Sequence, residues 1–152
     1  TPDEQYTHIS LWALLSAPLL IGCDLSSLDD FTLNLLTNDE VLAVDQDTLG
    51  NQASRLIKDG DIQVWGKPLA DNSFVIGVFD LSGDGNDPVS MIPWDNTNIT
   101  RQYKVNLNEI GLNSKYIARD LWRQKDEGIC EKELTVEINK HGVKLIKLTP
   151  AN

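Results

Sequence analysis

A short apolar run, Pro18-Leu19-Leu20-Ile21-Gly22-Cys23-Asp24, is the clearest hydrophobic feature of the first third of the chain. It begins at a proline and ends in Gly-Cys-Asp, a pattern typical of a buried strand. Apolar residues at helical spacing flank it, over Thr1 to Ala17 and over Ser27 to Asp47. Helix, apolar strand and helix in this order are typical of a parallel α/β sheet, covered on both faces. One strand cannot form a sheet, so we expect these residues to be the end of a larger α/β domain.

Both helical stretches carry start and stop signals. Thr1-Pro2-Asp3-Glu4 matches a capping box with proline in the first turn, and Pro18 is expected to end this helix. In the second stretch, Thr37-Asn38-Asp39-Glu40 interrupts the apolar spacing and starts a further short helix. Acidic pairs such as Asp29 and Asp30 are interpreted as helix caps rather than catalysts, because negative charge stabilises a helix N-terminus.

Beyond a candidate domain boundary at Asp45 to Asn51, the pattern changes to short stretches typical of β-strands. Asp59-Gly60 is a strong hairpin signal, and Asn139 to Gly142 predicts the last hairpin turn. About seven short strands in roughly 100 residues predict an antiparallel sandwich. The predicted strands are Arg55 to Lys58, Asp61 to Trp65, Ser73 to Asp80, Arg101 to Leu107, Lys115 to Trp122, Glu133 to Ile138 and Val143 to Leu148.

Composition and charge narrow the classes of function. The chain has 152 residues, of which 41% are hydrophobic and 24% charged, as in a soluble globular protein. Its net charge of −10 argues against binding to nucleic acid or to an anionic membrane, because no basic surface would neutralise phosphates. No apolar run is long enough to predict a membrane-spanning helix. Cys23 lies within the apolar run, so we expect it to be a buried free thiol.

Read by themselves, the residues do not form an active site. His8 and His141 lack partners at the spacing of a catalytic triad or a zinc site. Asp80 to Asp87 places carboxylates near glycines, but without the regular spacing and final glutamate of a calcium loop. The sequence therefore predicts no metal and no cofactor. Trp94 is a candidate for stacking on a sugar ring, and Asn98-Ile99-Thr100 is a glycosylation sequon.

Several ordered motifs nevertheless resemble one enzyme family, the α-galactosidases of the melibiase type (glycoside hydrolase family twenty-seven, clan D). The chain is similar to their C-terminal third over essentially its whole length, and the plant enzymes resemble it most. The motifs are Tyr6 to Ala13, Ala17 to Leu25, Asn38 to Gly50, Val64-Trp65, Ile110 to Leu112, Ala118 to Trp122 and Leu145 to Pro150. The sequence departs from the family at Asp45, usually asparagine, at Thr48, usually proline, and in a longer segment from Gly83 to Thr100.

The resemblance implies an α/β part plus an all-β part, namely the last βα segment of a (β/α)8 barrel followed by a C-terminal antiparallel β-sandwich. Residues 1–50 would be the seventh helix, eighth strand and eighth helix of the barrel, and residues 51–152 the sandwich. Family members retain the anomeric configuration with two aspartates about 5 Å apart, one the nucleophile and one the acid/base. Both lie on earlier barrel strands, in motifs that this sequence does not contain.

The resemblance therefore assigns no catalytic residue to this chain. Barrel enzymes place their sites at the C-terminal ends of the strands, so Ile21, Gly22, Cys23 and Asp24 would lie near the pocket of the longer enzyme. We expect Asp24 to be a structural or supporting carboxylate there.

Three functions remain open at this point. The longer enzyme would cleave terminal α-linked galactose from oligosaccharides or galactomannan, and this piece alone would be inactive. Alternatively, the sandwich is a carbohydrate-binding or interaction module that uses Trp94 and the segment Gly83 to Thr100. The same fold could also act on α-N-acetylgalactosaminides or another pyranoside. In isolation, the strand Leu19 to Cys23 would have open edges, so we expect the first fifty residues either to cover the sandwich or to mediate self-association.

Overall fold

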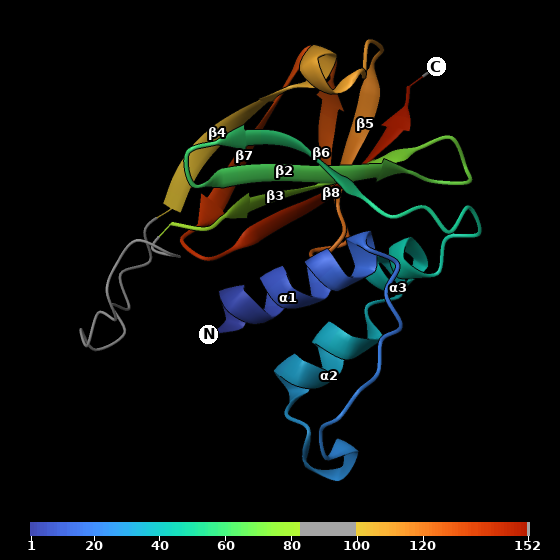
Figure 1. The fold of residues 1–152 in the computed structure, drawn as a ribbon, viewed down its shortest axis with the longest axis vertical. Coiled ribbons are helices and arrows are strands. Elements are labelled where there is room, and N and C mark those ends of the chain that lie inside the picture. Colours follow the sequence, from blue (N-terminus) through green and yellow to red (C-terminus); the bar gives the residue numbers. More distant parts are fainter. Residues whose placement is uncertain (83–99, 152) are drawn as a thin grey trace.

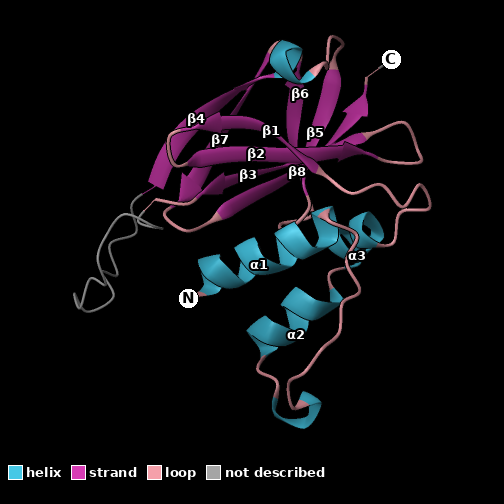
Figure 2. Ribbon diagram, in the orientation of Figure 1, coloured by secondary structure: helices cyan, strands magenta, loops and turns pink. Residues whose placement is uncertain are grey.

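The structure, a computed structural model, describes residues 1–82 and 100–151, and in this part of the chain helices cover a β-sandwich (Figures 1 and 2). The helices are α1 (Pro2–Leu14), the 3-10 helix η1 (Leu25–Ser27), α2 (Asp30–Thr37) and α3 (Asp39–Asp45). The strands are β1 (Ser54–Asp59), β2 (Ile62–Pro68), β3 (Phe74–Asp80), β4 (Thr100–Asn106), β5 (Tyr116–Asp120), β6 (Lys125–Cys130), β7 (Glu133–Asn139) and β8 (Val143–Pro150). A second 3-10 helix, η2 (Leu107–Ile110), follows β4.

The strands form two antiparallel sheets, which confirms the predicted sandwich. The larger sheet has six strands in the order β1-β2-β3-β8-β5-β6, and the smaller sheet pairs β4 with β7. The predicted hairpin at Asp59-Gly60 is confirmed, because β1 pairs with β2 across it and Gly60 has the positive φ of 56° that such a turn requires.

Two features of the sandwich differ from the sequence prediction. The turn at Asn139 to Gly142 is not a hairpin, because β7 pairs with β4 whereas β8 pairs with β3 and β5, so the turn joins the two sheets. Strand β6 was not predicted. Its residues Lys125 to Ile129 are all exposed at the edge of the large sheet, so they show no apolar alternation that could have identified a strand.

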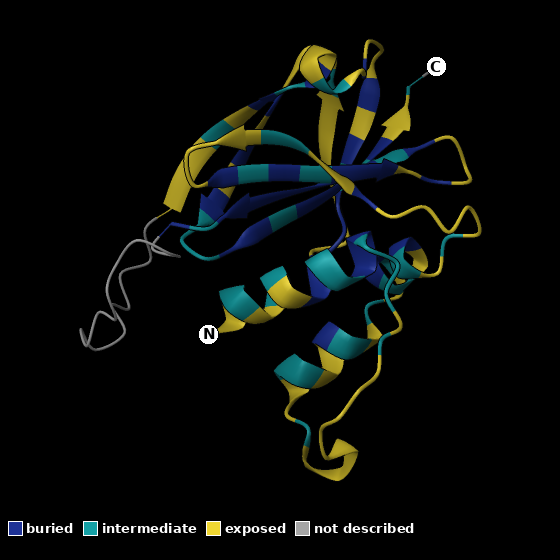
Figure 3. Cartoon of the chain, viewed as in Figure 1, coloured by how far each residue is buried: buried dark blue, intermediate teal, exposed yellow. Residues whose placement is uncertain are grey.

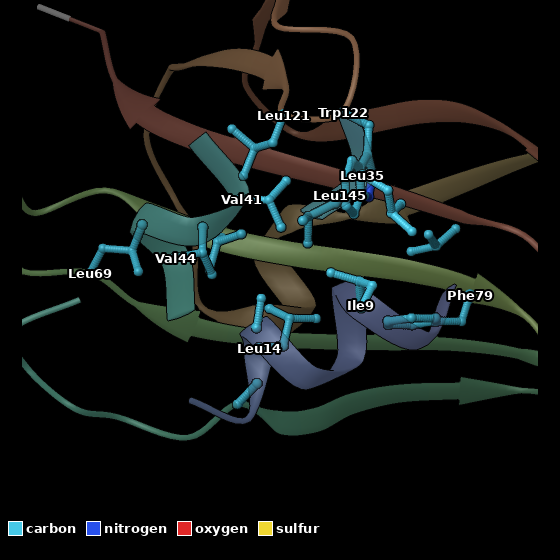
Figure 4. Close-up of a cluster of buried hydrophobic side chains, with 14 residues drawn as sticks. Ile9, Leu14, Leu35, Val41, Val44, Leu69, Phe79, Leu121, Trp122 and Leu145 are labelled. Carbon is cyan, nitrogen blue, oxygen red and sulfur yellow. The ribbon is translucent and has the colours of Figure 1, made fainter. Parts of the chain in front are cut away.

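The six-stranded sheet separates two hydrophobic cores. Alternate residues of β3 and β8 point to opposite faces, as the pattern of Phe74, Ile76 and Val78 against Val75 and Phe79 predicted. The first core lies between this sheet and the helices and includes Leu14, Val41, Val44 and Leu145 (Figure 4). The second lies between the two sheets and includes Val64, Ile76, Val105, Val136 and Leu148. Both faces of the large sheet are therefore buried near its centre.

The helix starts follow the predicted capping signals. Thr1 and Glu4 form the capping box of α1. The Asp29 side chain accepts a hydrogen bond from the Thr32 amide at the start of α2, and Asn38 caps α3 in the same way. The second predicted helix is divided into η1, α2 and α3, with the expected interruption at Thr37 to Asn38.

Helix α1 ends earlier than the sequence predicted. It stops at Leu14 instead of continuing to Ala17. The left-handed backbone of Ser16 ends the helix, and not Pro18. Within the described ranges, no helix is long and apolar enough to cross a membrane.

Candidate functional site

The residues expected near a pocket, Ile21, Gly22, Cys23 and Asp24, lie consecutively on an exposed segment that connects α1 to η1 (Figure 3). The strand predicted for Leu19 to Cys23 is not formed, and the prediction that Cys23 is a buried thiol is wrong. Ile21 is 50% exposed and Leu20 is 80% exposed. The physical reason is the absence of any neighbouring strand in the described structure: an extended segment becomes a strand only by pairing.

Asp24 has a definite structural role on this segment. Its carboxylate accepts hydrogen bonds from the amide and the hydroxyl of Ser26, at 2.9 and 2.7 Å, and from the hydroxyl of Ser27 at 3.0 Å. These bonds cap η1. The hydrogen bond from the Ser26 hydroxyl, followed by that from its amide, lowers the pKa of Asp24 below its ordinary value. Asp24 is therefore an ionised carboxylate whose oxygens already serve local donors.

Away from this exposed segment, side-chain hydrogen bonds join the helices to the large sheet around the end of β5. The indole N–H of Trp122 donates to the buried Ser10 hydroxyl at 2.8 Å. The guanidinium of Arg119 donates two hydrogen bonds to the Glu40 carboxylate, at 2.8 and 2.6 Å. These bonds with Glu40, and a further one with Asp126, raise the pKa of Arg119 above its already high ordinary value. Such paired bonds fix orientation as well as distance.

A cleft of about 310 Å³ opens beside this junction. Aromatic rings form part of its lining, with the centroids of Tyr6 and Trp122 4.8 Å apart in an edge-on arrangement. Gln124 donates to Asp39 across it at 2.6 Å. The cleft is lined by Tyr6, Asn34, Leu35, Thr37, Asn38, Asp39, Trp122 and Gln124. Aromatic rings with amides and a carboxylate are a lining suited to a sugar, and no local motif could have shown it, because its residues are far apart in sequence.

Sequence reasoning also missed Lys67, the only lysine among the buried residues of the described structure. Burial lowers its pKa, and the nearby carboxylates of Asp47 and Asp45 partly oppose that shift. A charged residue inside the apolar pattern Val64-Trp65-Gly66-Lys67 is the one signal that could have identified it.

The other candidate residues do not add a catalytic set. Among the described residues, no group of three or more His, Cys, Asp or Glu side chains is arranged to hold a metal ion. His8 stacks on Trp12 on the surface of α1, and a ring nitrogen of His141 lies 2.6 Å from the Ser82 carbonyl oxygen. Trp94 and most of the segments Asp80 to Asp87 and Gly83 to Thr100 lie outside the described residues.

Comparison with known proteins gives two family matches along the chain. Residues 1–47 match the family model described as alpha galactosidase A, and residues 59–148 match the model described as the alpha galactosidase C-terminal beta sandwich domain. The chain is 39% identical to alpha-galactosidase 2 of Arabidopsis thaliana over 151 residues, and 36% identical to an alpha-galactosidase of Cyamopsis tetragonoloba over 152 residues. These alignments cover 98% and 99% of this chain but 34% and 33% of the relatives.

Solved structures show the same similarity in three dimensions. The chain superposes on a β-L-arabinopyranosidase of glycoside hydrolase family 27 from Geobacillus stearothermophilus with a TM-score of 0.83 and 32% identity, covering 99% of this chain and 31% of the other. The corresponding values for alpha-galactosidase I of Mortierella vinacea are 0.84, 26%, 99% and 36%. The chain thus spans about a third of the length of the proteins that it matches.

Proposed function

We propose, from the premise that this chain belongs to the α-galactosidase family of glycoside hydrolases, that it is the C-terminal part of an enzyme that releases terminal α-linked galactose from oligosaccharides or galactomannan. The order of the two family matches carries this proposal: the first covers residues 1–47 and the second, a C-terminal sandwich, covers residues 59–148. The relatives are about three times as long as the matched region, which leaves room for a catalytic barrel before it.

In this proposal, residues 1–50 are the seventh helix, eighth strand and eighth helix of the barrel, and residues 51–152 are the sandwich. The exposed segment Pro18 to Asp24 supports the first assignment, since a barrel would supply the two neighbouring strands that it lacks here. The first fifty residues also share a core with the sandwich, as expected of the last barrel elements before a packed second domain.

The chemistry in this proposal belongs to the missing barrel strands. Two carboxylates about 5 Å apart would flank the scissile bond there. Ile21, Gly22, Cys23 and Asp24 would form part of the rim of the pocket at the C-terminal end of the eighth strand. Asp24 would hold this rim in shape through its bonds to Ser26 and Ser27 rather than attack the substrate.

The test compares this chain with a longer polypeptide that includes the upstream coding sequence. We expect the longer protein to hydrolyse an aryl α-galactoside and galactomannan, and the 152-residue chain to be inactive on both. An inactive but folded longer protein would contradict the galactosidase proposal. Activity of the short chain alone would contradict the division of labour between barrel and sandwich.

The sugar specificity of the longer enzyme needs a separate test, because one of the similar structures is an arabinopyranosidase and not a galactosidase. Its similarity to this chain, at 32% identity, favours testing pyranosides that share the galactose configuration but differ at single carbons. A panel of aryl α-galactoside, α-N-acetylgalactosaminide and β-L-arabinopyranoside on the longer protein would decide among them, and we expect the α-galactoside to have the largest kcat/KM.

A second candidate function is binding of a saccharide without catalysis. The cleft lined by Tyr6, Trp122 and several amides favours it, in addition to Trp94 of the sequence prediction. Calorimetric titration of the 152-residue chain with galactosides and galactomannan tests this function directly. Heat that saturates at millimolar sugar would support a binding module, and no heat would remove the support for it.

Self-association of the isolated chain is a further proposal. Several large apolar side chains within the first fifty residues are exposed, namely Leu20, Ile21, Leu25, Leu33 and Leu49. They lie away from the helix–sheet core, so a second copy could cover them. Sedimentation velocity from 5 to about 200 μM would show a dimer at the higher concentrations, and a monomer throughout would contradict the proposal.

A further inference from the structure

The end of α1 has a serine, Ser16, at a position that is most often glycine. The Ser16 amide donates to the Ala13 carbonyl at 3.2 Å, and the Ala17 amide donates to the Trp12 carbonyl at 3.3 Å. This pair of bonds is the Schellman motif, in which the residue after the helix cap is left-handed and is usually glycine. Ser16 has a φ of 49°, which is unfavourable for a residue with a β-carbon. Other contacts must therefore hold it there.

Lys67, on β2, supplies those contacts. It is only 1% exposed, and its ammonium group donates to the Ser16 hydroxyl at 2.6 Å, the Ala13 carbonyl at 3.1 Å and the Val44 carbonyl at 2.8 Å. The two carbonyls lie near the C-terminal ends of α1 and α3, where the helix dipoles favour a positive charge. The Ser16 hydroxyl in turn donates to the Asn51 carbonyl at 3.0 Å. All three N–H donors of the ammonium are satisfied.

The segment that follows has little to fix its own direction. Ala17 to Asp24 forms no helix or strand, and most of its side chains from Leu20 onward are exposed. Its path away from the sandwich must therefore be determined mainly where it leaves α1, at Ser16. A change from left-handed to right-handed backbone at this one residue would redirect all that follows.

We propose that Lys67 is a positioning residue that holds Ser16 in the left-handed conformation and so directs the segment Ala17 to Asp24. In this way the sandwich sets the path of a segment that belongs to the helical part of the chain. That the segment lies at a sugar pocket rests on the proposed function, whereas the coupling of Lys67 to Ser16 does not. The competing explanation is that Lys67 only fills space and satisfies helix carbonyls.

The two explanations make opposite predictions for a double variant. Lys67→Met keeps a long unbranched side chain, shorter by one heavy atom, but removes every donor, so we expect amide exchange at Ala17 to rise at least tenfold. Ser16→Gly removes the steric reason for a clamp, because glycine adopts positive φ readily. We therefore expect the double variant Lys67→Met, Ser16→Gly to restore the protection of the Ala17 amide to within about threefold of the parent chain.

Hydrogen exchange by NMR on the 152-residue chain measures the protection of the Ala17 amide without any enzyme assay. A negative result would therefore overturn the role of Lys67 and leave the galactosidase proposal untouched. Amides of β3 and β8 serve as internal references, and Lys58→Met, at an exposed lysine of β1, is the matched control. A double variant as poorly protected as Lys67→Met would overturn the proposal.

A milder variant covers the case in which Lys67→Met does not fold. Ser16→Ala leaves Lys67 and the helix carbonyls in place and removes only the hydroxyl that the ammonium binds. We expect at least a fivefold rise in exchange at Ala17, together with a shift of the Ser16 HN–Hα coupling constant away from its left-handed value. Unchanged exchange and coupling in Ser16→Ala would also overturn the proposal.

Discussion

On one face of the six-stranded sheet the chain packs its own second sheet, and on the other face it packs helices. The interior of the sandwich-side core is apolar, and its buried carboxylates, Asp80 and Asp120, are the last residues of their strands, where Asp80 pairs with Arg101 of β4 at 3.4 Å. The helix-side core is crossed by direction-specific polar bonds, from Lys67 to helix carbonyls and from Trp122 to Ser10.

The difference indicates what each interface has to achieve. The apolar contacts in the interior between the two sheets bury area without fixing one orientation. Hydrogen bonds between buried groups penalise any other arrangement, because a lost partner leaves an unsatisfied polar atom. The helix side is therefore built for one orientation of the helices on the sheet.

The largest expected effect comes from removing one leucine on each side of β8. Leu145 and Leu148 are both fully buried, the first in the helix-side core and the second in the sandwich-side core. Each substitution to alanine should lower the free energy of unfolding by about 2–5 kcal/mol. Urea denaturation followed by circular dichroism measures both.

The two variants should differ in where the structure loosens. Leu145→Ala should speed amide exchange first in α1 and α3, whereas Leu148→Ala should affect all strands of the large sheet together. Ile117→Ala, at a partly exposed position of β5, is the control and should change stability by less than about 0.5 kcal/mol. Identical exchange patterns in the two leucine variants would show that helices and sandwich unfold as one unit.

The next effect concerns the bond between Trp122 and Ser10. Ser10→Ala removes the acceptor of a buried indole N–H, which should cost about 1–3 kcal/mol. Ser10→Thr keeps a hydroxyl and serves as the matched control. Near-ultraviolet circular dichroism of Trp122 and urea denaturation would report the change. A Ser10→Ala variant as stable as the parent chain would contradict the expected contribution of this hydrogen bond.

The sequence predicted those features of the two interfaces that depend on residues close together in the chain, and missed those that depend on residues far apart in it. The alternation in Phe74 to Phe79 correctly indicated a strand with two apolar faces, because that pattern is local. The caps at Thr1 and Asp29 were predicted for the same reason. The apolar run Leu19 to Cys23 has the composition of a strand, but pairing needs neighbouring strands, and residues 1–82 and 100–151 supply none beside it.

The residues that sequence reasoning missed act over long separations. Lys67 meets Ala13 across 54 positions and Trp122 meets Ser10 across 112. A local pattern can mark Lys67 as unusual, but no local pattern identifies the partner of either residue, since lysine and serine are mostly surface residues. Asp24, in contrast, serves donors two and three residues away, and its expected structural role stays a prediction for the longer enzyme.

At Asp45 we expect a smaller effect of opposite sign: a substitution that raises the free energy of unfolding. Its Oδ1 is buried without a hydrogen-bond partner in the described structure, and burial raises the pKa of this carboxyl, although nearby Lys67 opposes the shift. A carboxyl whose pKa is raised on folding favours the folded state below its ordinary value of 3.8 and loses that contribution as the pH rises through the folded pKa. Asp45 therefore destabilises the protein at pH 7.

Asp45→Asn should remove that penalty and raise the free energy of unfolding at pH 7 by less than about 1 kcal/mol, with a smaller gain at pH 3. Thermal denaturation at the two pH values measures the difference, with Asp30→Asn in the first turn of α2 as the control carboxylate. A gain that is equal at both pH values would argue that the charge of Asp45 has no part in it.

The smallest expected effect is at Asp71, in the turn between β2 and β3. Burial acts to raise the pKa of this carboxyl, but hydrogen bonds from Lys147 and Ser73 outweigh it and hold the pKa at about 2. The Lys147 ammonium lies 2.6 Å from Oδ2. Because the folded pKa lies below the ordinary 3.8, the stabilisation is present above pH 4 and is lost as the pH falls towards 2.

Asp71→Asn should consequently flatten the acid limb of the stability curve between about pH 4 and pH 2. The Asp71 side chain is 54% exposed, so solvent screens the pair and the loss at pH 7 should stay below about 1 kcal/mol. Salt at about 0.5 M should weaken the pair further, and Asp61→Asn in the β1–β2 turn is the control substitution. Since Lys147 lies on the helix side of β8, opposite Val75, an acid limb that Asp71→Asn does not alter would contradict a contribution of this pair to acid stability.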